Sequence, residues 1–455
     1  MASRVLTPSD AMFLYGESRE TMMHVASLLI FSRPEDAAPD YLREVLDEIR
    51  DCCDVQPPWN LKLKTPDFLM NPRHVWEEQD EVDLDYHVRR SALPSPGDER
   101  ELGILVSRLH GHSIDFHRPP WEVHLIEGLE NDRFALFFKI HHSLMDGFTG
   151  SKTLARSLST TPEDVEKPVF FMLPEPERPA GEAKQRGGWR EVLRAQWETA
   201  RQVGSELLEV AQGKDPDLVL PYQAPKCILN GRIGRNRRFA TQQYGLDRLK
   251  AIAKKSETTL NDVVMALSAA SLRRFLMELG ELPGDPLIVM MPVNVRPKDD
   301  PGGGNAVGAI LASLATDIAD PAERLQAIHD SSCHAKAQLQ GMSKDAILQY
   351  TTLTMLPFGL QQVTGLSGRT RPAFNVVISN VPGPDHPLYF RGAKLEANYP
   401  VSIPIHGQAL NITCVSYNGT LNFGFTGCRD TLPSMQRLAV YTGEALEELE
   451  AALGM

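Results

Sequence analysis

The spacing of apolar side chains predicts a mixed α/β protein, because helical and strand patterns alternate along its first part. Apolar positions three and four residues apart predict amphipathic helices over 41–52 and 101–110. Residues 24–31 form a strand-like run. Residues 134–140 are apolar at successive positions and too few for a confident helix, so they predict an interior strand.

The second part follows a change in composition. Between 160 and 188 the chain becomes polar and rich in Pro, Glu and Lys, as linkers are, and Trp and aliphatic residues at helical spacing over 189–210 predict an amphipathic helix. This helix docks on the protein's own surface or contacts a membrane or lipid droplet. A long helix over 261–279 should end at Gly280. Strands are expected over 287–295, 374–379, 410–417 and 420–425.

The length of 455 residues exceeds what one hydrophobic core usually supports, so two domains are expected. We expect an amino-terminal domain over 1–160, a linker with the amphipathic crossover helix over 161–215, and a carboxy-terminal domain over 216–455.

Composition narrows the class of partner and the compartment. A formal net charge of −12 argues against a nucleic-acid partner, because no overall positive field would attract phosphate backbones. The six cysteines show no disulfide spacing, and the first residues lack a signal-peptide core. These features predict a cytoplasmic protein. No apolar run reaches the roughly 18 residues of a spanning helix, so any membrane or droplet contact should be peripheral.

One segment, His141 to Gly147, places two imidazoles, a carboxylate and a glycine directly after the predicted interior strand. Because successive strand side chains point to opposite faces, His142 should share a face with the apolar core residues and His141 should point the other way. The Asp-Gly pair predicts a turn, with a helix after it. A neutral imidazole, with a pKa of about 6.5, can take a proton from an alcohol near neutral pH.

Other interpretations of this segment remain open from the residues alone. The histidines could be a buried, hydrogen-bonded pair, and Asp146 could either orient a base or pair with an arginine and hold the loop. A metal site is disfavoured, because adjacent strand residues diverge and no Cys-x-x-Cys or His-Glu-x-x-His spacing supplies further ligands. The arginines at 232, 235, 237 and 238 are either a solvated face or a local site for a phosphate-bearing ligand.

Several motifs carry a resemblance to a known family. His141 to Gly147 matches the His-His-x-x-x-Asp-Gly signature of coenzyme A-dependent acyltransferases related to chloramphenicol acetyltransferase. Further segments resemble motifs of the bacterial wax ester synthase/diacylglycerol acyltransferases: Leu6 to Asp10, Met23 to Val25, Pro119-Pro120-Trp121, Asn261-Asp262, Pro292 to Arg296, and Ser379 to Pro384. Pro120 stands where that family usually has leucine.

The resemblance implies two chloramphenicol acetyltransferase-like α/β domains, with an active-site tunnel at their interface. It implies transfer of a long acyl chain from acyl-CoA to a fatty alcohol or to diacylglycerol, without a metal or redox cofactor. His142 would act as general base in a direct attack that forms no acyl-enzyme. Asp146 would pair with Arg296 and shape the site, with His141 and Gly147 as support.

The remaining motif residues have structural alternatives. Asn261 is a candidate for the tunnel or for a helix N-cap. Ser379 and Asn380 either contact substrate or only end a strand before a proline-stiffened turn. Trp121 is a tunnel candidate that core packing would also explain, and Glu17 is a candidate for lining the site.

Two rival functions remain at this stage. A condensation-type domain acting on carrier-bound acyl groups shares the His-His-x-x-x-Asp-Gly signature, but the chain has no carrier segment with a modifiable serine. A non-catalytic lipid-binding or droplet protein would be expected to have lost a catalytic residue, and His142, Asp146 and Arg296 are all present. Under any of these functions, peripheral contact is expected to be with the inner membrane or lipid droplets.

Overall fold

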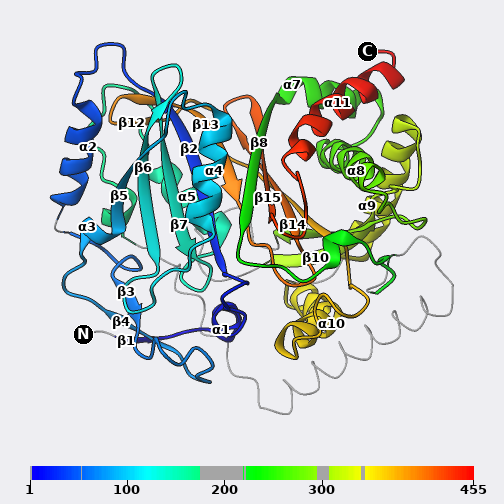
Figure 1. Ribbon diagram of the computed structural model, residues 1–455, viewed down its shortest axis with the longest axis horizontal. Helices are drawn as coiled ribbons and strands as arrows, with labels where there is room; N and C mark the ends of the chain where they lie inside the picture. The colour runs from blue at the N-terminus through cyan, green and yellow to red at the C-terminus, as the bar shows by residue number, and fades with distance from the viewer. Residues whose placement is uncertain (1–2, 53, 175–218, 220–221, 295–306, 340–343) are drawn as a thin grey trace.

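The computed structural model describes the chain except for residues 1–2, 53, 175–218, 220–221, 295–306 and 340–343. The expected amphipathic helix over 189–210 and Arg296 therefore lie outside the described residues. Two halves stand side by side, each built on a six-stranded sheet (Figure 1).

The first sheet mixes strands from both ends of the chain. Its order is β12 (Tyr389–Phe390), β13 (Ala393–Val401), β2 (His24–Ser32), β7 (Arg133–His141), β6 (Trp121–Leu129) and β5 (Val88–Ala92). All neighbours are antiparallel except β6 and β5. In Figure 1 the orange strands β12 and β13 lie beside the blue and cyan ones. A domain boundary drawn along the sequence does not show that β12 and β13, from the second part of the chain, belong to the first sheet.

Helices cover both faces of the first sheet. One face packs against α2 (Tyr41–Arg50) and α5 (Gly147–Arg156), and the other against α4 (Glu99–His110). The alternation of β2 explains this division: Leu29 and Phe31 join the first cluster, and Leu28 and Ile30 the second. The smaller elements are α1 (Pro8–Tyr15), α3 (Leu84–His87), η1 (Phe170–Met172), η2 (Ile228–Asn230) and the sheet of β1 (Ser3–Val5), β4 (Val75–Glu78) and β3 (Leu61–Leu63).

The second sheet is also mixed. Its order is β10 (Val307–Ser313), β9 (Ile288–Asn294), β11 (Val376–Val381), β14 (Leu410–Tyr417), β15 (Thr420–Cys428) and β8 (Arg237–Gly245), with β11 parallel to both β9 and β14. Its helices are α7 (Leu246–Lys255), α8 (Leu260–Leu279), α9 (Pro321–Leu339), α10 (Lys344–Val363) and α11 (Arg437–Ala452).

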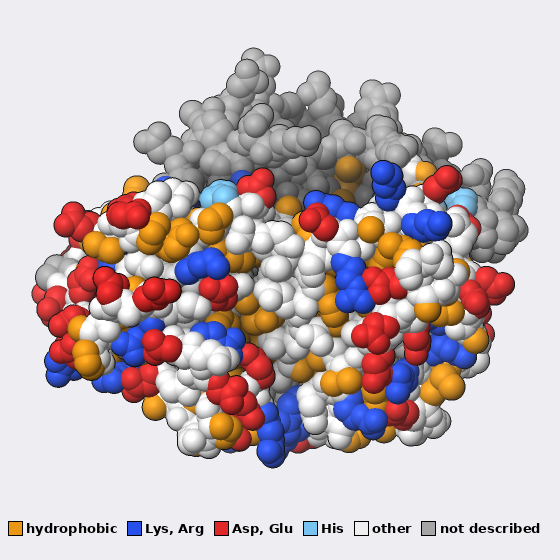
Figure 2. All heavy atoms as spheres, turned by 90° about the horizontal axis from the view of Figure 1, so that it is seen from above, with side chains coloured by type: hydrophobic (Ala, Val, Ile, Leu, Met, Phe, Trp, Pro, Cys, Tyr) orange, Lys and Arg blue, Asp and Glu red, His pale blue; other side chains and the backbone are white. Residues whose placement is uncertain are grey.

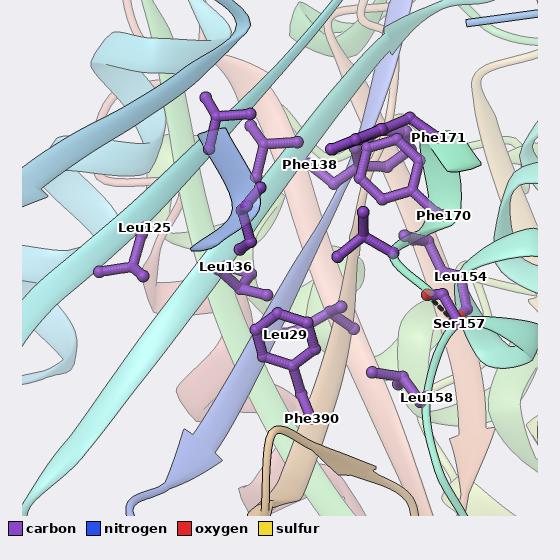
Figure 3. Close-up of a pocket in the computed structure, with 14 residues that line it drawn as sticks. Leu29, Leu125, Leu136, Phe138, Leu154, Ser157, Leu158, Phe170, Phe171 and Phe390 are labelled. Atoms are coloured by element: carbon purple, nitrogen blue, oxygen red, sulfur yellow. Dashed lines mark hydrogen bonds between the residues drawn. The ribbon is translucent and has the colours of Figure 1, made fainter. Parts of the chain in front are cut away.

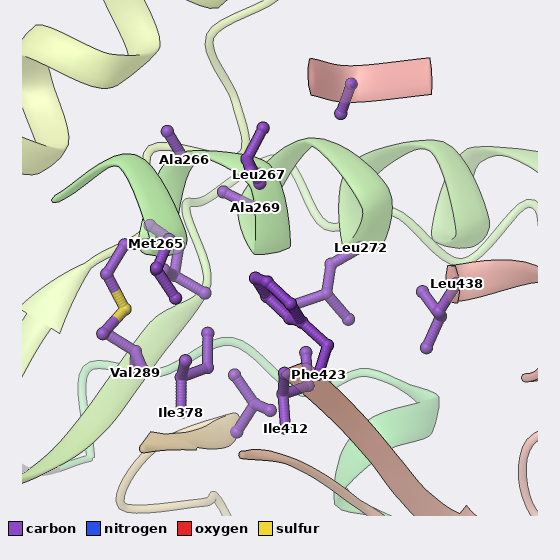
Figure 4. Close-up of a cluster of buried hydrophobic side chains, with 14 of the residues drawn as sticks. Met265, Ala266, Leu267, Ala269, Leu272, Val289, Ile378, Ile412, Phe423 and Leu438 are labelled. Carbon is purple, nitrogen blue, oxygen red and sulfur yellow. The ribbon is translucent and has the colours of Figure 1, made fainter. Parts of the chain in front are cut away.

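The core of the second half forms where α8 lies on the sheet. Figure 4 shows Leu267 and Leu272 of α8 among Val289, Ile412 and Phe423 from three strands. All five side chains are almost completely buried. The helix ends at Gly280, whose φ of 69° is a left-handed conformation that glycine adopts without strain.

The two halves meet along β13 and α4. At Gly424 of β15 a Cβ atom would lie 1.9 Å from the carbonyl oxygen of Pro400, so only glycine allows the two strands to come so close. On the other side, the backbone N–H of Phe239 donates to Ser107 Oγ of α4 at 2.9 Å. The interface is thus fixed by backbone contacts as well as by side chains.

The predicted elements within the described residues are confirmed to within a few residues, and β7 is an interior strand between β2 and β6. Of the two alternatives for Asn261, the helix N-cap is wrong. Thr259 caps α8 and forms a capping box with Asp262, which leaves Asn261 inside the first turn. No described helix is long and apolar enough to cross a membrane. Acidic and basic side chains are interspersed on the face shown in Figure 2, without a continuous basic area.

Candidate active site

Backbone hydrogen bonds position the His141–Gly147 segment at the end of β7. The N–H of His141 donates to the carbonyl of Pro120, and that of His142 donates to the carbonyl of Met23, both at 2.9 Å. The motif Pro119-Pro120-Trp121 therefore lies beside the two histidines, as does the segment around Met23. These segments are distant in the sequence and meet here because β7 lies between β2 and β6.

Both ring nitrogens of His141 are engaged. Nδ1 lies 2.6 Å from Ser143 Oγ and accepts from the Ser143 N–H at 3.2 Å, so Nε2 carries the proton and donates to Glu17 at 3.3 Å. The same Glu17 carboxylate accepts from the Met23 N–H. His141 is completely buried. Its imidazole is fixed in one orientation and has no free nitrogen to exchange a proton with a substrate.

His142 has a different environment. Its ring stacks on Phe13 of α1, with centroids 4.0 Å apart, and its Nδ1 is buried without a hydrogen-bond partner among the described residues. Burial lowers the pKa of His142 to about 4, although the nearby Asp146 carboxylate partly opposes the change. The imidazole is therefore neutral near pH 7, which is the form that can accept a proton.

Asp146 caps the helix after the loop. Its carboxylate accepts from the Thr149 backbone N–H at 2.8 Å and from the Thr149 hydroxyl at 3.2 Å, at the N-terminus of α5. A carboxylate at this position also interacts favourably with the helix dipole. The expected partner, Arg296, lies outside the described residues, so that pairing stays a prediction.

A row of buried histidines continues from the site into the domain interface. His24 is the strand partner of His141, and its Nε2 lies 2.9 Å from the carbonyl of His110. The Nε2 of His110 in turn lies 2.8 Å from the carbonyl of Ser402, in the second half of the chain. Burial lowers the pKa of both residues, that of His110 to about 3. These histidines fit the alternative of buried, hydrogen-bonded side chains.

A cavity lies next to the histidine loop. It reaches Ile140 and Gly147, one on each side of the loop, and continues along α5 to Gly150 and Ser151. Its other lining residues come from the end of β13 and the residue after it (Pro400, Val401 and Ser402) and from the second sheet (Val381, Thr413 and Val415). We call this space the interface cavity. It lies where the resemblance predicts a substrate tunnel.

The other candidates do not themselves line this cavity. Glu17 contacts His141, as described above. Ser379 and Asn380 are half-buried on β11, directly before the cavity residue Val381. Asn261 contacts the Met291 sulfur at 3.6 Å. Trp121 is a core residue rather than a tunnel residue, because it is fully buried and its indole N–H donates to the carbonyl of Trp59 at 2.7 Å.

The arginine cluster lies away from the interface cavity. Arg235, Arg237 and Arg238 line a surface pocket between α4 and β8, together with Arg108 and Arg429. Arg237 is buried and donates to the backbone carbonyls of Gly234 and Glu20, so it stabilises the fold. Among the described residues, no group of three or more His, Cys, Asp or Glu side chains is placed to hold a metal ion.

Sequence reasoning missed the residues that distinguish the two histidines. Phe13 stacks on His142, and Ser143 holds Nδ1 of His141. Ser143 lies inside the motif, where its position two residues after His141 was a usable signal. Phe13 comes from a helix far away in the sequence, and nothing in the local pattern of α1 indicates its contact.

Sequence comparisons with known proteins point to one family. Residues 6–264 match the model of the wax ester synthase/diacylglycerol acyltransferase catalytic domain, and residues 303–450 match the model of the carboxy-terminal domain of the same family. A Mycobacterium tuberculosis protein whose name proposes diacylglycerol O-acyltransferase activity is 54% identical, over 99% of this chain and 98% of that protein. The O-acyltransferase WSD of Acinetobacter baylyi is 40% identical over the same shares.

Solved structures show the same fold. The wax ester synthase/diacylglycerol acyltransferase of Marinobacter aquaeolei VT8 superposes with a TM-score of 0.81, at 41% identity and 99% coverage of both chains. The first condensation domain of the calcium-dependent antibiotic synthetase superposes with a TM-score of 0.61 at 17% identity, covering 100% of this chain and 97% of that one. The latter similarity concerns the fold alone.

Proposed function

The chain belongs to the wax ester synthase/diacylglycerol acyltransferase family, and we propose that it transfers a long acyl group from acyl-CoA to a fatty alcohol or to diacylglycerol, with His142 as general base. The products are a wax ester or a triacylglycerol. The Marinobacter protein, which is named for both activities, supports the pair of acceptors.

The proposed reaction is a single displacement. The acceptor hydroxyl attacks the thioester carbonyl while His142 takes the hydroxyl proton, and the tetrahedral intermediate then expels the coenzyme A thiolate. The imidazolium returns its proton to that sulfur, so the enzyme ends unchanged. Proximity of the two substrates and general-base catalysis supply the acceleration.

The contrast between the two histidines carries this proposal. His141 has both ring nitrogens occupied by Ser143 and Glu17, whereas Nδ1 of His142 has no hydrogen-bond partner among the described residues. Only His142 therefore has a nitrogen available for a substrate hydroxyl. Its neutral state near pH 7 supports the same role.

Coenzyme A release tests the proposal. With palmitoyl-CoA and hexadecanol the purified protein should release free coenzyme A and form the ester. His142→Ala should lower the rate by about 10²–10⁴-fold, with an unchanged melting temperature. His142→Ala turnover at the wild-type rate would exclude His142 as the base.

The proposed chemistry requires no metal or redox cofactor, because acyl-CoA is already activated and His142 handles the proton. Activity should therefore survive dialysis against a strong chelator. Loss of activity that added Mg²⁺ or Zn²⁺ restores would show that the scheme lacks a component.

We also propose that the protein meets its acceptors at a lipid surface, as a peripheral protein, since both acceptors are lipids with little aqueous solubility. Flotation with vesicles that contain diacylglycerol should carry the protein to the lipid fraction. Its complete absence from that fraction would argue for acceptor delivery by another protein.

A further inference from the structure

A second internal cavity lies within the first half of the protein. Its walls are apolar apart from Ser157, whose hydroxyl donates to the carbonyl of Leu154. In Figure 3, Leu125 and Leu136 of the sheet lie on one side, and Leu154 and Leu158 lie on the opposite side. We call it the sheet cavity. Walls of this kind favour an alkyl chain over charged and strongly polar ligands.

The sheet cavity adjoins the interface cavity, because Phe138 and Leu154 line both. One face of β7 connects them: Ile140 lines the interface cavity, Phe138 both cavities, and Leu136 the sheet cavity. At about 3.4 Å per residue, the backbone from His142 to Leu136 extends about 20 Å. A chain that starts beside His142 and follows this face therefore enters the sheet cavity.

A basic groove meets both cavities from outside. It runs between α5 and the turn at Pro382 to Pro384, and its cationic side chains are Lys152, Arg156 and Lys167. The groove shares Ser151 with the interface cavity and Leu158 with the sheet cavity. The arginine pocket between α4 and β8 shares no lining residue with either cavity.

The charge of the groove decides which substrate uses this side. Coenzyme A carries phosphates, whereas a fatty alcohol and diacylglycerol carry none. Cationic side chains attract phosphates even in a protein with a net charge of −12. The alkyl chain attached to coenzyme A is therefore the one closest to the sheet cavity.

We propose that the sheet cavity binds the alkyl chain of the acyl-CoA, with the coenzyme A phosphates in the groove along α5. This assignment rests on the proposed acyltransferase function and adds to it which substrate approaches from which side. It also predicts that the depth of the sheet cavity limits the length of the acyl chain and has no effect on the alcohol.

Two neighbouring residues of β6 offer a matched test. Leu125 lines the sheet cavity, whereas Ile126 faces α4, and both are almost completely buried. Leu125→Phe should lower the ratio of kcat/KM for palmitoyl-CoA to that for octanoyl-CoA by at least about tenfold, with hexadecanol held constant. Ile126→Phe should leave that ratio unchanged. Should either variant fail to fold, Val123→Leu fills the same cavity by a single methylene group.

A second series varies the alcohol with octanoyl-CoA held constant. The ratio for hexadecanol to octanol should be the same in the wild type and in Leu125→Phe. A change in the alcohol ratio would assign the cavity to the acceptor and overturn the proposal, as would an unchanged acyl ratio. Arg156→Glu should raise KM for both acyl-CoAs without changing KM for hexadecanol, and an unchanged KM would remove the groove from the assignment.

The outcome separates this inference from the proposed function. A wild-type protein that releases no coenzyme A from either donor would refute the function itself. An active wild type whose chain-length preference survives Leu125→Phe and Val123→Leu would refute only the cavity assignment.

Discussion

The core under α8 is built mostly from apolar side chains, with Asp262 as the one charged side chain that α8 buries completely, whereas the core around β7 buries Lys139, Glu122 and several histidines. Lys139 donates to two backbone carbonyls and lies 3.0 Å from the Glu122 carboxylate. The two internal cavities also adjoin β7, and neither reaches the cluster in Figure 4.

This difference separates scaffold from site. Burying polar groups and leaving empty space both reduce stability, so a core that served only the fold would contain little of either. The first half accepts these costs where the histidines and the alkyl cavity lie. The second half supplies well-packed residues that line the interface cavity and, in the proposed scheme, Arg296.

Acid should destabilise the first half most. Burial lowers the pKa of His87 to about 4, that of His110 to about 3 and that of His24 well below its usual value. In the unfolded chain the histidine pKa values are near 6.5. At a pH between the native and the unfolded pKa values the unfolded chain therefore binds more protons than the native state, and the free energy of unfolding falls as the pH drops below about 6.5. For His87 alone the loss reaches about 3 kcal/mol by pH 4.

Chemical denaturation at pH 7 and pH 5 measures this effect. His87→Gln, which retains a donor for the Trp121 carbonyl, should reduce the difference in unfolding free energy between the two pH values. An equal difference in the wild type and the variant would exclude His87 as a source of acid sensitivity.

Asp146→Ala should destabilise the contact between the halves. If the carboxylate is paired with Arg296, its removal leaves a buried charge unpaired, at a cost of about 3–5 kcal/mol. Asp146→Asn keeps an acceptor for the Thr149 N–H. It should therefore recover only the part of the lost stability that comes from helix capping, about 1 kcal/mol. Thermal melting of both variants separates the contribution of capping from that of the ion pair. Unchanged melting of Asp146→Ala would contradict the structural role.

Leucine truncation should affect the two cores unequally. Leu267 is packed on all sides under α8, whereas Leu29 lines the sheet cavity and has fewer neighbours to lose. Leu267→Ala should cost about 3–5 kcal/mol, and Leu29→Ala about 1–2 kcal/mol less. Equal losses in urea denaturation would show that the sheet cavity does not loosen its core.

Local patterns were enough to predict most elements. The apolar run before the histidines became β7, the periodic segment after Asp262 became α8, and Gly280 ended that helix. These predictions succeeded because periodicity and capping depend on residues close together in the sequence. The N-cap at Thr259 was missed because two polar residues of the same segment competed for that role.

Long-range assembly could not be predicted in the same way. Nothing in residues 393–401 indicates that they pair with β2 rather than with the second sheet. The stacking of Phe13 on His142 and the cavity along β7 also depend on how separate elements pack. The motif located the candidate site, but the different states of its two histidines became visible only in three dimensions.

The first turnover tests direct transfer to the acceptor most sharply. Rapid mixing of the enzyme with palmitoyl-CoA alone should release no coenzyme A beyond slow hydrolysis. With hexadecanol present, coenzyme A and ester should appear with the same rate constant. A burst of coenzyme A equal to the enzyme concentration, without any acceptor, would reveal an acyl-enzyme and contradict the single displacement assisted by His142.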